Sequence, residues 1–174
     1  MGAPRAHRHT TMKRITTIGV YGSTAADFLD RLAGQGVDLL LDLRQRRGVR
    51  GPDHCWANSA RLQRSLAAAG IAYRHVKDLA PTTELRHLQY REDDRQGVGK
   101  RNRVALAPAY VERYTREILD RYDFGALIAE LPGTTALFCV ERDAAACHRS
   151  LVAARLGGTI GWCDPVDRRR PPSP

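Results

Sequence analysis

The sequence predicts an α/β fold: a single three-layer domain in which helices cover both faces of a mostly parallel sheet of about four or five strands. Three observations predict it. The chain has 174 residues, about the length of one domain. Hydrophobic residues make up 43% of it, which is enough for a core. Short apolar runs of strand length alternate with segments whose apolar residues recur at helical spacing, as in parallel sheets with helical crossovers.

Three strands and two helices are predicted in the first half of the chain. Residues 15–21 are β-branched and apolar and end before a glycine, which indicates a buried strand. Residues 25–33 have apolar side chains at helical spacing. Residues 37–43 form a nearly continuous apolar run, as expected for a strand that is covered on both faces. A helix at 59–69 then leads to an alternating strand at 71–76.

The second half of the chain resumes this alternation after residue 108. The apolar side chains of 110–122 lie on one side of an amphipathic helix, and a short helix is expected at 124–130. Residues 134–140 are apolar and β-branched and form the predicted fourth strand. A helix at 147–156 and a short last strand at 159–162 complete the pattern.

The ends of the chain differ in composition from the domain between them. Residues 1–13 are basic and residues 164–174 are rich in arginine and proline, which is typical of flexible tails. The α/β domain is therefore expected to span 14–163. Within it, 77–103 is a long charged excursion, for which we predict either a flexible lid or a poorly ordered loop.

The chain is strongly basic, with 28 Lys and Arg against 19 Asp and Glu and a net charge of +9 at pH 7. This charge favours an anionic partner, either a small-molecule substrate or nucleic acid. No apolar run approaches the roughly 20 residues of a membrane span, so no membrane partner is expected. The basic N-terminus lacks the apolar stretch of a secretory signal, which predicts a cytoplasmic protein. The oligomeric state is left open.

Polar residues lie at the end of each of the first four predicted strands or directly after it. In parallel sheets, ligands bind beyond the carboxyl ends of the strands, and these ends meet at one edge. We therefore expect the residues at these ends to form one site. They are Tyr21 and Ser23, Asp42 and Arg44, His75, and Glu141.

The segment from the fourth strand into the last helix is the densest in reactive side chains. Cys147, His148 and Arg149 open the predicted helix, where free N–H groups stabilise an anion or a thiolate. Cys147 is thus either a reactive thiol or a buried, inert one. Cys139 lies inside the apolar strand and is assigned to the core. Glu141, at the mouth of the strand, is the better candidate for acid/base chemistry.

No metal and no cofactor are predicted. The four cysteines form no dense disulfide framework, and no C-x-x-C or H-x-x-x-H pair supplies two metal ligands locally. Residues 19–23 contain two glycines but lack the third glycine of a dinucleotide fingerprint and the lysine of a phosphate loop.

The motifs in this chain resemble those of the domain of unknown function 488 (DUF488) family over about residues 14–157. Members of that family read T-I-G-H-S at the first strand, D-V-R at the second, Y-x-H at the third, and C-x-E followed by C-H-R-S at the end. The counterparts here are residues 17–19, 42–44, 73–75, 139–141 and 147–150. The first motif departs from the family, because the usual His-Ser after the glycine is absent and Ser23 stands two residues further on.

The resemblance implies a compact α/β fold with a pocket, but no reaction, because the activity of the family is not established. It also implies that six residues act as one constellation: Asp42, Arg44, Glu141, Cys147, His148 and Arg149. In this constellation, the two arginines suit bidentate capture of phosphate or carboxylate. The two carboxylates suit activation of water or of a substrate hydroxyl.

These observations lead to one leading prediction and three alternatives. The leading prediction is a hydrolase or transferase that binds an anionic, phosphorylated or nucleotide-like substrate at this edge. Its catalytic candidates are Glu141 and Asp42, with Cys147 and His148, and its substrate-binding candidates are Arg44, Arg149, Ser23, Tyr21, His75 and Ser150. The alternatives are a module that binds nucleic-acid backbone without catalysis, thiol chemistry that depends on Cys147, and a scaffold whose Arg–Asp–Glu cluster is a buried ion-pair network.

Overall fold

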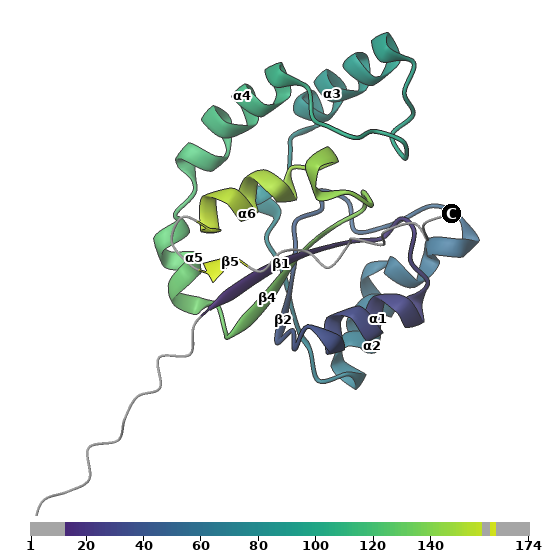
Figure 1. The fold of residues 1–174 in the computed structure, drawn as a ribbon, viewed down its shortest axis with the longest axis vertical. Coiled ribbons are helices and arrows are strands. Elements are labelled where there is room, and N and C mark those ends of the chain that lie inside the picture. Colours follow the sequence, from purple (N-terminus) through teal and green to yellow (C-terminus); the bar gives the residue numbers. More distant parts are fainter. Residues whose placement is uncertain (1–12, 158–160, 163–174) are drawn as a thin grey trace, which may run out of the picture.

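Five parallel strands form one sheet in the computed structural model, which describes residues 13–157 and 161–162 (Figure 1). Along the sheet the order is β3-β2-β4-β1-β5, and every pair of neighbours is parallel. The fold class predicted from the sequence is confirmed. The strands are β1 (Arg14–Gly19), β2 (Leu39–Asp42), β3 (Ala72–His75), β4 (Thr134–Cys139) and β5 (Gly161–Trp162).

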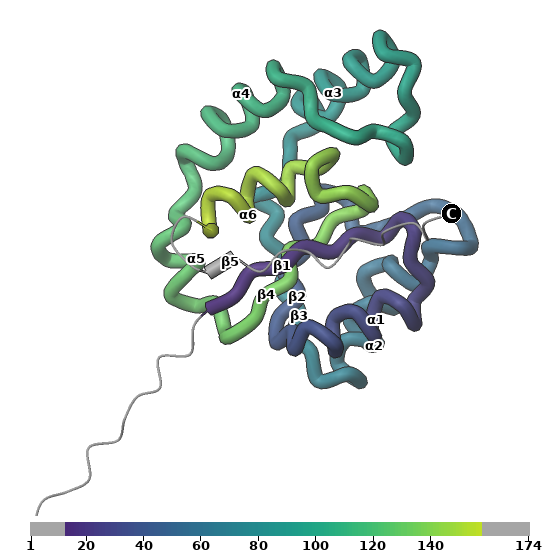
Figure 2. The backbone as a smooth tube through the Cα atoms, in the orientation of Figure 1, coloured from purple at the N-terminus to yellow at the C-terminus, as the bar shows by residue number. Residues whose placement is uncertain are grey.

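Helices cover the sheet on both sides (Figure 2). One side carries α1 (Ala25–Gly34) and α2 (Ser59–Ala68). The other carries α3 (Thr83–Gln96), α4 (Pro108–Glu117), α5 (Phe124–Glu130) and α6 (Arg149–Gly157). Short 3-10 helices lie in the connections: η1 (Pro52–Ala57), η2 (Lys77–Leu79), η3 (Leu119–Arg121) and η4 (Ala144–Ala146).

Side-chain alternation along the strands divides the core into two clusters. Leu41 and Leu137 pack on the side of α6, whereas Leu40 and Phe138 pack on the side of α1 and α2. This is the period of two that a strand imposes. Cys139 has the same parity as Leu137, so its side chain lies on the α6 side, at the carboxyl end of the sheet.

The predicted charged excursion is more regular than expected. The poorly ordered loop was the wrong expectation for most of it, because α3 is a helix of 14 residues. The buried face of α3 has one apolar residue, Leu85, followed at helical spacing by Gln89 and Asp93. Arg103 and Gln89 both donate hydrogen bonds to Asp93, so the polar groups on this face are satisfied. Hydrophobic periodicity does not detect a helix whose buried stripe is polar. Closure of the segment as a lid stays a prediction.

The predicted tails, 1–13 and 164–174, lie outside the described residues apart from Lys13. No helix within the described part of the chain is both long enough and apolar enough to cross a membrane.

Candidate functional site

A cavity of about 420 Å³ opens at the carboxyl ends of β1, β2 and β4, on the α6 side of the sheet. Its wall is formed by the loops after β1 and β2, by α3, by the segment between α3 and α4, and by the connection from β4 to α6. This is the edge at which the sequence predicts a site. Of the predicted site residues, those on the cavity wall are Tyr21, Arg44, Glu141, Cys147 and His148. Those that do not line the cavity are Asp42, Arg149, Ser23, His75 and Ser150.

Asp42 and Arg44 form a buried ion pair at the cavity, which Arg44 lines and Asp42 does not. Arg44 Nε and Nη2 donate to the two carboxylate oxygens of Asp42 at 2.9 and 2.7 Å. The Arg44 backbone N–H and the Tyr73 hydroxyl donate to the same carboxylate. Asp42 is 0% exposed, so substrate has no access to it. Asp42 therefore holds Arg44 in place, as in the scaffold alternative.

Arg149 positions the backbone that carries Glu141. Its Nη1 donates to the Glu141 carbonyl oxygen at 2.7 Å, and its Nη2 donates to the Arg142 carbonyl oxygen at 2.8 Å. The side chain is 1% exposed and does not line the cavity. These contacts assign Arg149 to the support of the β4–α6 connection rather than to direct capture of an anion.

Three further predicted residues make local structural hydrogen bonds. Ser23 Oγ accepts from an arginine of α1 at 3.2 Å. His75 Nε2 donates to the Arg44 carbonyl oxygen at 2.8 Å. Ser150 Oγ donates to the Cys147 carbonyl oxygen at 2.8 Å, in the turn that leads into α6. Their contacts support the loops around the cavity.

Glu141 is the one acidic side chain on the cavity wall among the described residues. Its Oε1 lies 3.7 Å from Lys100 Nζ and 3.9 Å from Arg103 Nη1. Its Oε2 is buried and has no hydrogen-bond partner in the described part of the chain. Burial raises the pKa of Glu141, and the charge of Cys147 adds to this, while Lys100 and His148 oppose it. A buried carboxylate oxygen without a partner is uncommon in folded proteins, which singles out Glu141 among the cavity residues.

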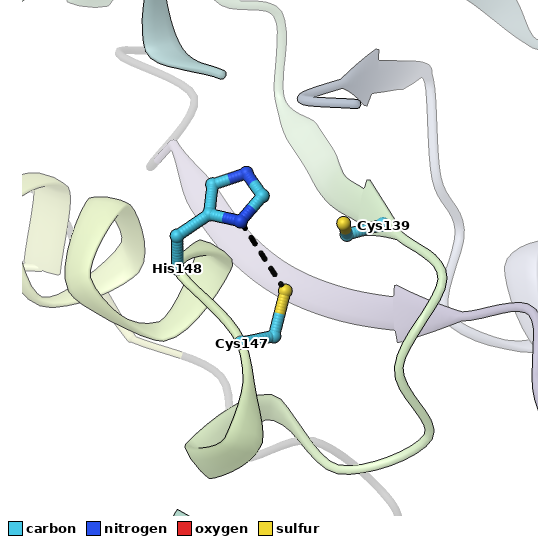
Figure 3. Close-up of side chains that lie close together, drawn as sticks. All are labelled: Cys139, Cys147 and His148. Atoms are coloured by element: carbon cyan, nitrogen blue, oxygen red, sulfur yellow. Dashed lines mark hydrogen bonds between the residues drawn. The ribbon is translucent and has the colours of Figure 1, made fainter. Parts of the chain in front are cut away.

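Cys139, Cys147 and His148 lie close together in the cavity (Figure 3). Cys147 Sγ is 3.6 Å from His148 Nδ1, and His148 Nε2 donates to the Leu43 carbonyl oxygen at 3.0 Å. Burial disfavours the Cys147 thiolate, but a hydrogen bond from Cys139 and the charges of His148 and Arg149 hold the pKa of Cys147 well below its usual value. A hydrogen bond to Cys147, together with burial, raises the pKa of Cys139.

The fold brings Cys139, Cys147 and His148 close enough to bind one metal ion, although their spacing in the sequence matches no metal-binding motif. Cys139 ends β4, and η4 then turns the chain back so that Cys147 and His148 approach it. Their ligand atoms lie within 4.8 Å of one another. The prediction of no metal rested on the lack of a local ligand pair, and the fold supplies a convergent group without one.

Six basic residues that were not among the predicted site residues also line the cavity. They are Arg46, Arg50, Arg86, Lys100, Arg101 and Arg103. Arg46 and Arg50 belong to the basic run after β2, and the others come from the charged excursion. Arg101 lies over the Tyr21 ring, at 5.2 Å from its centroid. The many basic residues in these two segments could have indicated an anion site. A run of charged residues, however, more often forms a solvent-exposed face.

Gly19, at the end of β1, packs directly against the backbone of Glu141. A Cβ at this position would lie 1.9 Å from the Glu141 carbonyl oxygen. We therefore expect Gly19→Ala to lower the free energy of unfolding by about 1–3 kcal/mol, because backbone must move. Gly34→Ala is the matched control, since nothing lies within 4 Å of that Cβ. It is expected to raise stability by about 0.4–1 kcal/mol. Urea denaturation measures both, and equal stabilities of the two variants would contradict this packing.

Comparison with known proteins gives one match. A search of curated proteins and a search of solved structures each found none. The model of a family described as "Domain of unknown function DUF488" matches residues 24–156. The matched segment extends from the residue before α1 into α6 and includes every residue of the cavity wall except Tyr21. Because this match covers well over half of the chain, the protein belongs to the DUF488 family, whose function is unknown.

Proposed function

We propose that the protein is an enzyme, a hydrolase or a transferase, whose substrate is an anionic, phosphorylated or nucleotide-like small molecule that binds in this cavity. The charge of the cavity wall carries the proposal. Among the described residues, the wall has seven Lys and Arg side chains and one carboxylate, that of Glu141. Asp42 and Asp93 neutralise two of these cations, Arg44 and Arg103. Of the remaining five, Lys100 is paired with Glu141, and the other four give the cavity a positive potential that attracts an anion.

The size of the cavity favours a small molecule. Its volume of about 420 Å³ falls within the range of about 300–1,000 Å³ that is typical of ligand sites. Arg46 and Arg50 reach it from the loop after β2, and Lys100 and Arg101 from the segment after α3. Guanidinium groups bind phosphate through paired hydrogen bonds, so cations on two segments suit a ligand that carries one or more phosphates.

Glu141 favours catalysis over binding alone. Glu141 lines the same cavity as the cations, and Lys100 and Arg103 are near its Oε1. In hydrolysis, the Glu141 carboxylate takes a proton from water as the water oxygen attacks phosphorus. The bond from phosphorus to the leaving oxygen breaks, and that oxygen then receives the proton. In transfer, a substrate hydroxyl takes the place of water. The cations stabilise the charge on the phosphoryl oxygens.

Cys147 offers a second candidate function at the same cavity. The observation that favours it is the 3.6 Å contact between Cys147 Sγ and His148 Nδ1. In this reaction the sulfur attacks the substrate, the leaving group departs, and water cleaves the covalent intermediate. Rapid quenching followed by mass spectrometry of the intact chain separates the two mechanisms. A substrate-derived adduct on Cys147 identifies the thiol as the nucleophile, and turnover without any adduct favours Glu141.

Thermal unfolding in the presence of inorganic phosphate, nucleoside phosphates and sugar phosphates tests the proposed substrate class. A ligand at 100 times its Kd stabilises the folded state by about 2.7 kcal/mol. We expect at least one phosphorylated compound to raise the Tm of the wild-type protein. If none does so, the proposal fails. Tight binding of duplex DNA that weakens steeply with salt would instead identify a nucleic-acid backbone-binding module.

The variant Arg46→Ala/Arg50→Ala tests where the anion binds. Because each hydrogen bond to a charged group contributes about 1.5–3 kcal/mol, loss of both guanidinium groups is expected to weaken binding by at least about tenfold. The control is Arg64→Ala, which removes an exposed arginine from α2 on the other side of the sheet. Isothermal titration with the compound that gives the largest Tm shift measures both variants. Equal weakening by both would show that the anion binds elsewhere.

A further inference from the structure

Two sulfurs and one imidazole nitrogen converge in the cavity with the spacing of metal ligands. The ligand atoms of Cys139, Cys147 and His148 lie within 4.8 Å of one another, and Cys147 Sγ is 3.6 Å from His148 Nδ1. Tetrahedral zinc binds sulfur at about 2.3 Å and imidazole nitrogen at about 2.0–2.1 Å, which holds such ligands about 3.6 Å apart. The Cys147–His148 pair therefore already has the separation of two ligands on one zinc ion.

The surroundings of His148 fix the ring in a ligating orientation. Its Nε2 donates a hydrogen bond to the Leu43 carbonyl oxygen at 3.0 Å, so Nε2 carries the hydrogen and Nδ1 faces Cys147. Histidine ligands of metals almost always donate their second ring N–H to a carbonyl or carboxylate. The imidazole is 5% exposed and packs against the Tyr114 ring, with 5.6 Å between centroids. These contacts hold the ring so that Nδ1 stays toward the two sulfurs.

We propose that Cys139, Cys147 and His148 bind a zinc ion that keeps one coordination position open to the cavity. Two thiolates and an imidazole suit zinc, whereas magnesium and calcium prefer oxygen ligands. Three protein ligands are the number found in catalytic zinc sites, and structural sites have four. All three residues line the cavity, so a zinc ion that they hold would be reached from the space in which a substrate would lie.

Glu141 lies near this group without belonging to it. Its carboxylate is not one of the atoms that converge within 4.8 Å, and its Oε2 has no partner among the described residues. The catalytic role of the zinc, which rests on the proposed function, follows from this arrangement. Zinc lowers the pKa of a bound water to about 7. In the proposed hydrolysis, Glu141 would accept the proton that this water loses while the water oxygen bonds to phosphorus, and the bond from phosphorus to the leaving oxygen would break as that oxygen receives the proton. The zinc site itself does not depend on that role.

Metal analysis of the full-length protein, purified without chelator, tests the site. We expect one zinc per chain after dialysis, with release of the thiol protons when zinc is added to the metal-free protein. Cobalt(II) is expected to give the intense visible bands of tetrahedral coordination and a thiolate-to-cobalt charge-transfer band in the near ultraviolet. Cys139→Ser, Cys147→Ser and His148→Asn are each expected to weaken zinc binding by at least about tenfold.

Cys55→Ser is the matched control for these variants. Cys55 is half-buried in η1, where its sulfur accepts a hydrogen bond from Arg61, and it is not one of the three converging residues. This variant is expected to keep the zinc and the cobalt spectrum. The ligand variants are checked for folding by circular dichroism. If they do not fold, the cobalt spectrum of the wild-type protein and a competition titration with a chelator still show whether the protein has a thiolate-ligated metal site.

Three results would overturn the zinc site. They are a wild-type protein that binds no zinc, a cobalt spectrum without a thiolate band, and a protein that has lost two free thiols because Cys139 and Cys147 form a disulfide. The test of the zinc site and the test of the proposed function can fail independently of each other. Zinc binding without any Tm shift by phosphorylated compounds would remove the function and leave the metal site. The reverse result would remove the metal site alone.

Discussion

Asp42→Asn is expected to lower the free energy of unfolding by about 3–5 kcal/mol, because it leaves a buried guanidinium without its counter-charge. Arg44 is 2% exposed, and two of its nitrogens donate to the Asp42 carboxylate. Asparagine keeps the shape of the side chain but has one acceptor oxygen and no charge. Urea denaturation gives this loss directly, provided that the m-value does not change.

The exposed ion pair between Arg74 and Glu130 supplies the control. Glu130→Gln removes a carboxylate of which 61% is exposed and is expected to cost less than about 1 kcal/mol. The double variant Asp42→Leu/Arg44→Met removes both buried charges and is expected to recover much of the loss. A cost below 1 kcal/mol for Asp42→Asn would show that the pair does not stabilise this edge of the sheet.

Glu141→Gln is expected to reduce turnover by about 10²–10⁴-fold, because the amide cannot accept or return a proton. The substrate for this measurement is the compound that raises the Tm most, and the readout is the release of phosphate or the transfer of the phosphoryl group. The fold is expected to remain intact, since glutamine has nearly the same shape as glutamate and no hydrogen bond to Oε2 is lost within the described part of the chain.

Glu130→Gln is also the control for Glu141→Gln, because Glu130 lies in α5 and does not line the cavity. It is expected to leave turnover unchanged. Unchanged turnover in Glu141→Gln, with wild-type binding of the same compound, would exclude the carboxylate as the acid/base group. Such a result would favour the Cys147 mechanism at this cavity.

The sequence is sufficient to predict the strands and most helices because their local patterns match their environments. Residues 134–140 are all apolar or β-branched, and β4 is buried along its whole length. Residues 124–130 were predicted as a short helix, and α5 has those bounds. The helix α3 escaped prediction because Gln89 and Asp93 occupy its buried face.

The edge at which the site lies was also predictable, since parallel strands bring their carboxyl ends together. The roles of single residues were not. Asp42 and Arg44 stand two residues apart in the chain, and the sequence does not reveal that they bind each other. Arg149 has the chemistry of an anion ligand, but it donates to two backbone carbonyl groups. Such pairings depend on the positions of distant backbone atoms, which no local pattern encodes.

The proposed metal ligands could not be predicted from the sequence for the same reason, because they come together only in the folded chain. Cys139 and Cys147 are eight residues apart, outside the spacing of a paired zinc motif, and η4 between them returns the chain toward β4. Lys100 and Arg101 reach the cavity from a segment that looks like a solvated loop in the sequence. Only the fold shows that the proposed metal ligands and these two cations line one cavity.

A crystal of the protein soaked in tungstate, an analogue of phosphate with strong anomalous scattering, provides the most direct measurement of anion binding at this cavity. We expect an anomalous peak inside the cavity, within hydrogen-bonding distance of at least two of the cations Arg46, Arg50, Arg86 and Lys100. A cavity without tungstate at saturating concentration, or tungstate bound on other surfaces alone, would contradict the proposed anionic substrate site.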